Sequence, residues 1–162
     1  MPYDFGAIEP KWQKKWAESK IFESMAPGEL SSTWGGNPMA SAATLAVLDA
    51  MENEKLPENA RVMGEYLKPL LLDLKQKFTC IGDVRGKGLV IGLEIVQPDD
   101  GFTPASKLTG KIIRAGAERG LLMGKVGIYG NVIRVAPPLV INKEEIDIAV
   151  EILEESIAAA MD

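Results

Sequence analysis

Apolar residues recur at helical spacing in the central part of this chain. The clearest stripe consists of Leu67, Leu70, Leu71 and Leu74. Positions three and four apart lie on one side of a helix, so the stripe predicts a helix from Pro57 to about Lys77. Pro69 lies within that segment and is expected to kink or split it, because proline lacks a backbone N–H.

The same spacing predicts further helices before and after this one. They run from Pro38 to about Lys55, from about Ala105 to Arg119, and from about Lys143 to Ala160. Gly120 is a natural stop for the second of these. Thr109 is expected on its surface. The buried face of the last helix should consist of Ile146, Ala149, Val150, Leu153 and Ile157.

Between these helices, short apolar runs predict strands. They are Leu89–Val96, which is β-branched and apolar except for Glu94, then Leu121–Met123 and Val132–Val135. The segment Asp83–Gly88 is interpreted as a glycine-rich turn in which Asp83 and Arg85 brace the backbone. After residue 36 the order is helix, helix, strand, helix, two strands, helix. This order predicts an α+β fold, a small antiparallel sheet with helices packed on one face.

The first 23 residues form a block of different character. Ile8, Trp12 and Trp16 are four positions apart and share one helical face, while lysines occupy much of the remainder. We interpret residues 1–23 as an amphipathic leader helix that docks on the body or on a partner. The predicted domains are therefore 1–23 and 24–162.

Composition excludes several classes of function. Asp and Glu number 23 against 18 Lys and Arg, so no basic balance suggests a nucleic-acid partner. Apolar stretches are too short to span a membrane, and no signal peptide is recognised. The single Cys80 fits a reducing compartment and predicts a cytoplasmic location. Histidine is absent, which removes histidine-dependent nucleophiles and metal sites.

The segment Ser31–Pro38 is the first candidate for a binding site. Its two hydroxyl residues, Ser32 and Thr33, precede a glycine pair and then Asn37 and Pro38. Asn is a strong helix N-cap, and Pro is favoured at the first helical position. Glycines and hydroxyls beside a helix start can hold a phosphate group. The alternative is ordinary punctuation between a loop and a helix.

Arg134 is the second candidate. It lies in the strand-like run Val132–Val135 and alternates to the face opposite its apolar neighbours. A guanidinium in a partly dry setting needs an anionic partner, and a carboxylate gripped bidentately is the natural one. A structural salt bridge to an acidic residue of the chain is the alternative. Glu94 in its apolar strand is expected to be paired or to face solvent.

Four blocks together resemble the C-terminal small domain of the class III, pyridoxal-phosphate-dependent aminotransferases. They are Ser32–Pro38, Asp83–Glu94, Gly120–Leu122 and Ile133–Leu139, in the family's order, and the resemblance covers about residues 28–161. The second block looks closest to alanine–glyoxylate-type and omega-aminotransferases.

The resemblance implies a role for each candidate. Thr33 would contact the phosphate of pyridoxal 5'-phosphate (PLP) in a neighbouring subunit, with Ser32 as its companion, and Arg134 would clamp the α-carboxylate of the amino-acid substrate. It further implies amino acid and 2-oxo acid substrates and a homo-oligomer. The family's cofactor lysine and its acidic partner belong to a large domain that this sequence does not match. We therefore predict no aminotransferase activity for the chain alone.

The first block, from Tyr3 to Trp16, resembles the extreme N-terminus of bacterial leucyl-tRNA synthetases. Combined with the aminotransferase-like remainder, it gives the chain a chimeric character. Three hypotheses follow: a fragment of an aminotransferase, a catalytically inert α+β module that is truncated, chimeric or designed, and an RNA-binding synthetase fragment. The last depends on the leader alone.

Overall fold

A computed structural model describes residues 10, 14, 15, 17, 18 and 37–161 of the chain. The five described residues of the leader are helical and exposed. Ile8, Trp12 and Trp16 lie outside the described residues. Helix α2 (Pro38–Asn53) has no buried residue. No helix in the described part of the chain is long and apolar enough to cross a membrane.

Residues 48–162 form a compact unit of helices and strands. The helices after α2 are α3 (Leu56–Lys77), α4 (Ser106–Glu118) and α5 (Lys143–Met161). The strands are β1 (Ile81–Lys87), β2 (Val90–Ile95), β3 (Gly124–Val126) and β4 (Val132–Val135). All strand pairs are antiparallel, and the sheet order is β1-β2-β4-β3.

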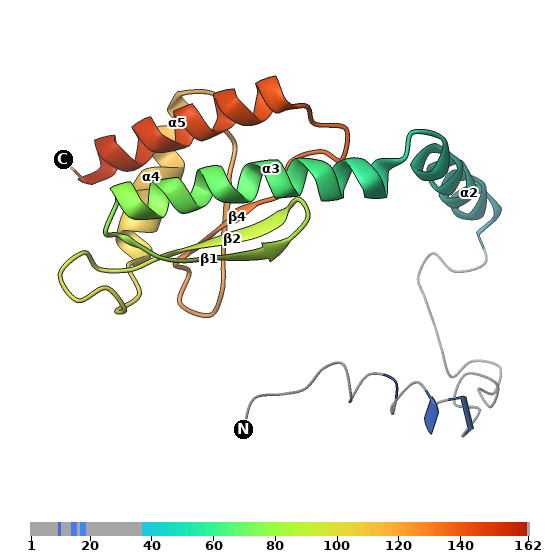
Figure 1. Cartoon of the computed structure of the whole chain (residues 1–162), viewed down its shortest axis with the longest axis horizontal. Coiled ribbons are helices and arrows are strands. Elements are labelled where there is room, and N and C mark those ends of the chain that lie inside the picture. The colour runs from blue at the N-terminus through green and yellow to red at the C-terminus, as the bar shows by residue number, and fades with distance from the viewer. Residues whose placement is uncertain (1–9, 11–13, 16, 19–36, 162) are drawn as a thin grey trace. The chain divides into compact units, whose positions relative to one another are not determined.

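One face of this sheet is covered by helices. Helix α3 contacts β1, α4 contacts β2, β3 and β4, and α5 packs on both of these helices (Figure 1). Strand residues alternate between the two faces, and Val84, Leu93 and Ile133 are buried on the covered one. The other face, which carries Arg85 and Arg134, is open. The predicted α+β fold, with a small antiparallel sheet and helices on one face, is confirmed.

Helix α3 continues through Pro69 as a single helix, so of the two expectations, a kink or a split, the split is wrong. A proline inside a helix costs about 3 kcal/mol or more because one hydrogen bond is lost. Burying a leucine side chain contributes about 1.5–3 kcal/mol. Leu67, Leu71 and Leu74 are buried on either side of Pro69, and together they offset its cost.

The glycine-rich turn expected at Asp83–Gly88 is wrong, because residues 83–87 belong to strand β1. Ile81 and Val84 are buried in the core, and their burial against the helices favours pairing with β2 despite the glycines. Only Gly88 and Leu89 form the turn, where Gly88 has φ 55°, a left-handed conformation that glycine adopts without strain. Among the described residues the chain therefore has four strands rather than three.

Two smaller expectations also differ from the structure. The strand expected at residues 121–123 lies at 124–126 instead, where it pairs with β4. Thr109 is fully buried rather than on the surface, and its hydroxyl donates to the carbonyl of Ala105, the N-cap residue of α4. That internal hydrogen bond satisfies the hydroxyl and lets α4 bury a polar residue.

Candidate functional site

Arg134 lies at the centre of the open face, between two glycines. On β4 it pairs with Gly92 of β2 on one side and with Gly124 of β3 on the other. Directly opposed residues of an antiparallel pair project to the same face, with Cβ atoms about 4.5–5.5 Å apart. Because neither neighbour has a side chain, both flanks of the arginine are uncovered.

Arg134 is exposed and forms no ion pair with any described acidic residue. The structural salt bridge considered from the sequence is therefore not found within the described residues. The partly dry setting expected for Arg134 is also wrong, because the glycines on either side leave its side chain open to solvent. The N–H donors of the Arg134 guanidinium are therefore accessible from solvent on this face.

The acidic groups on the same face are already engaged. Arg85 donates from Nη1 to Asp83 Oδ2 at 2.9 Å and to Glu94 Oε2 at 2.5 Å. The hydrogen bond from Arg85 lowers the pKa of Asp83, and the two carboxylates raise the pKa of Arg85. Glu94 is thus paired, as expected. Asp83 and Arg85 pair through their side chains, and the backbone of Val84 also helps to lower the pKa of Asp83.

A cavity of about 480 Å³ includes Arg134 in its lining. Most of the remaining lining is apolar and comes from α3, α5 and the segments around β3 and β4. Glu145 also lines it, but its carboxylate accepts from the backbone N–H of Asn142, whose side chain in turn accepts from the N–H of Glu145. This reciprocal capping box engages Glu145 at the start of α5.

The candidate phosphate ligands Ser32 and Thr33 lie outside the described residues. The helix start that follows them is described. Asn37 Oδ1 accepts from the backbone N–H of Met39 at 2.9 Å and of Ala40 at 3.3 Å, so the predicted N-cap is confirmed. These two amides are occupied by the cap. A phosphate here would therefore depend on Ser32, Thr33 and neighbouring groups rather than on the amides of Met39 and Ala40.

Gly92 and Gly124 are the neighbours of Arg134 in the candidate site, and the sequence analysis did not single them out. Gly92 stands in an apolar strand and Gly124 follows an apolar run, and neither has a feature that marks a site. Their role depends on register, which sets both of them beside Arg134. A glycine inside a strand sometimes indicates the close approach of a ligand, and this was the available signal.

The profile of the family Aminotransferase class-III matches residues 12–157. A mitochondrial alanine–glyoxylate aminotransferase 2 homolog of Arabidopsis thaliana is 46% identical over 127 residues, which are 78% of this chain and 27% of that protein. An alanine/serine racemase of Pyrococcus horikoshii is 45% identical over 138 residues, 85% of this chain and 29% of that protein.

Solved structures agree with these sequence matches. An aminotransferase of Bacillus anthracis superposes with a TM-score of 0.76 at 33% identity, over 86% of this chain and 34% of that one. An acetylornithine aminotransferase of Elizabethkingia anophelis gives a TM-score of 0.73 at 38% identity, over 87% and 35%. The chain spans about a quarter to a third of the length of these relatives.

The chain therefore belongs to the class III aminotransferase family. The family match begins at residue 12, inside the block 1–23 that resembles a leucyl-tRNA synthetase. That second resemblance, and a domain boundary at residue 23, stay predictions.

Proposed function

We propose that this chain is the small-domain part of a PLP-dependent class III aminotransferase, which transfers an amino group from an amino acid to a 2-oxo acid. In this proposal residues 24–162 are the small domain. Arg134 binds the α-carboxylate of the substrate.

The observation that carries the proposal is the exposed guanidinium of Arg134 between Gly92 and Gly124, which has no ion pair with any described residue. A planar guanidinium can donate two parallel hydrogen bonds to a carboxylate, and such a pair is among the stronger polar contacts in proteins. The two glycines leave space for a ligand to approach both flanks. The acidic residues of the same face are paired with Arg85, so they do not compete for Arg134.

The cofactor enters the proposal through Ser32 and Thr33, which would contact the PLP phosphate of a neighbouring subunit. When bound, PLP supplies an electron sink for the transfer of the amino group. The family's cofactor lysine belongs to a large domain, so we expect no turnover from this chain alone, even with added PLP. A homo-oligomer and a cytoplasmic location are also part of the proposal, and Cys80, a buried free thiol, supports a reducing compartment.

Carboxylate binding at Arg134 can be tested by NMR with the ¹⁵N-labelled chain and alanine as the probe. We expect saturable shifts centred on Arg134, Gly92 and Gly124. Arg134→Gln should weaken binding more than about tenfold, because a charge-assisted pair is lost. Arg114→Gln is the matched control, since Arg114 is another exposed arginine, on α4, and it should bind alanine like the wild type. Equal shifts in R134Q and the wild type would refute the assignment.

A second candidate is an inert α+β module that binds no substrate. It is favoured by one fact, that the chain matches only about a quarter to a third of its relatives' length. The same titration separates the two candidates. Absence of any saturable shift in the wild type would favour the inert module.

A further inference from the structure

Arg85 and Arg134 stand on either side of Gly92 in one row of the sheet. Arg85 of β1 pairs with Gly92 of β2, which pairs with Arg134 of β4. All three residues project to the open face, because opposed residues of antiparallel strands share a face. Two cations therefore flank a strand position that has no side chain.

Glu94 lies diagonally next to Arg134 on that face. It pairs directly with Val132, which is two residues before Arg134 on β4. Diagonal neighbours in a sheet are about 7–8 Å apart, a distance that long side chains span. A glutamate and an arginine in this relation would ordinarily form an ion pair. Here Glu94 turns to Arg85 instead.

We propose that Arg85 is a positioning residue for Arg134, because it holds Glu94 and so keeps the carboxylate-binding arginine unpaired. This inference rests on the proposed function of Arg134. Arg85 is itself shared with Asp83, and the two carboxylates together hold its guanidinium at the β1–β2 side of the face. Without Arg85, Arg134 is the described cation that remains within diagonal reach of Glu94. The Glu94 carboxylate then pairs with Arg134 and takes the place of the substrate carboxylate.

A double-mutant cycle tests the pairing without any ligand. The cycle consists of Glu94→Gln, Arg134→Gln and the double variant that carries both changes. Each is made in the wild-type background and in the Arg85→Gln background, and its urea unfolding midpoint is measured. Because Glu94 contacts Arg85 in the native chain, the two changes should be additive in the wild type. They should be non-additive in the R85Q background, where Glu94 and Arg134 meet. If R85Q does not fold, Arg85→Met replaces it.

Alanine binding tests the consequence for the site. We expect R85Q to raise the Kd about two- to fivefold, the range in which an exposed ion pair competes. R85Q combined with Glu94→Gln should restore the wild-type Kd. R85Q combined with Asp83→Asn removes the same amount of charge but leaves Glu94 unheld, so the Kd should stay raised. This matched pair distinguishes release of Glu94 from a general loss of positive charge.

The two measurements fail separately. If the wild-type chain shows no alanine shift but the cycle is non-additive only with R85Q, the proposed function is wrong and the role of Arg85 stands. The role of Arg85 is overturned if Glu94 and Arg134 are coupled equally in the wild-type and R85Q backgrounds. It is also overturned if they are coupled in neither background. Restoration of the Kd by Asp83→Asn as complete as by Glu94→Gln also overturns it, since charge alone would then account for the effect.

Discussion

At the scale of single residues, the open face of the sheet combines charges of both signs in a fixed pairing. Arg85 is bound by Asp83 and Glu94, and the side chains of all three remain partly exposed. Exposed pairs contribute little to stability, about 0–1 kcal/mol each. The arrangement of these pairs has a larger effect on which charged side chains stay free to bind a ligand than on stability. Beside these paired groups, Arg134 is an arginine of this face that has no ion pair with a described residue.

The pH dependence of unfolding should report the Asp83–Arg85 pair. The hydrogen bond from Arg85 lowers the pKa of Asp83 in the folded chain. A lowered carboxyl pKa contributes stability above its unfolded pKa, and that stability is lost as the pH falls from about 5 through the folded pKa. Asp83→Asn should therefore destabilise the chain at neutral pH by less than about 1 kcal/mol, and lose less on acidification than the wild type.

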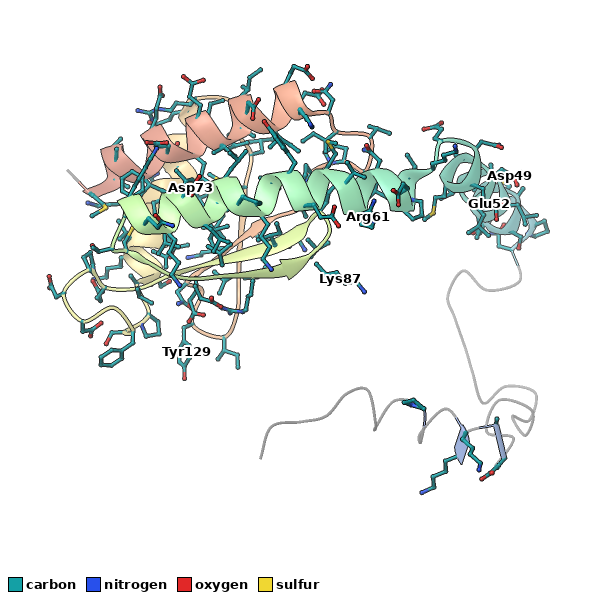
Figure 2. The ribbon with its side chains drawn as sticks, viewed as in Figure 1. Asp49, Glu52, Arg61, Asp73, Lys87 and Tyr129 are labelled. Carbon is teal, nitrogen blue, oxygen red and sulfur yellow. The ribbon has the colours of Figure 1, made fainter. Side chains whose placement is uncertain are left out.

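Urea unfolding at neutral pH and at about pH 3 measures this difference. Asp73→Asn is the control, because Asp73 is an exposed aspartate of α3 with no ion pair among the described residues (Figure 2). It removes a carboxylate without removing a pair. The prediction is contradicted if the free energy of unfolding of D83N falls as much between neutral pH and about pH 3 as that of the wild type.

At the scale of elements, the helices depend on how closely they approach the sheet. Gly64 of α3 faces the β1–β2 turn, and a Cβ there would lie 2.4 Å from the carbonyl carbon and oxygen of Gly88. Gly110 of α4 has open space where its Cβ would be. Gly64 is therefore needed for close packing of α3 on the turn. The described structure shows no packing reason for Gly110.

Alanine substitutions at these glycines should have opposite effects. Gly110→Ala should stabilise the chain by about 0.5–1 kcal/mol, because alanine loses less conformational freedom in a helix. Gly64→Ala should destabilise it by about 1–3 kcal/mol, because the backbone of the turn has to move. Thermal or urea unfolding of the two variants, each the control for the other, measures both signs. A G64A chain as stable as the wild type would mean that α3 does not approach the turn so closely.

At the scale of the whole molecule, several large apolar side chains of residues 48–162 stay in solvent. The most exposed include Ile128 and Tyr129, in the loop between β3 and β4, and Leu122 before it. Figure 2 shows Tyr129 projecting away from the sheet. Val90 adds an apolar side chain to the open face. Exposed apolar side chains such as these lower the free energy of a complex when another protein surface covers them.

We expect the purified chain to self-associate as its concentration rises. Replacing the two loop residues, Ile128→Ser with Tyr129→Ser, should lower the association because it removes apolar contact area. Lys125→Ser in the adjacent strand is the control, since it changes a polar residue and should leave association as it was. Sedimentation velocity over a range of concentrations measures the mass. A monomeric mass at the highest concentration would contradict this expectation.

Much of the fold was predictable because helices are local. The sequence predicted the start of α3 to within one residue, at Pro57 rather than Leu56. Gly120, with φ 90°, follows the end of α4 as expected. The N-cap at Asn37 was also predictable from residue type. Strand β1 was missed, because its glycines suggest a turn and its stability comes from β2 and from α3.

The sequence by itself determined the α+β class, the four described helices, the position of β4 and the identity of Arg134 as a candidate ligand for a carboxylate. These follow from spacing within a few residues of each other. Only the tertiary structure decided which residues surround Arg134. Gly92, Gly124 and Glu94 come from other strands, and their places on the face depend on the antiparallel register. Register is fixed by burying one face against the helices, a property of the assembled sheet that no single segment carries.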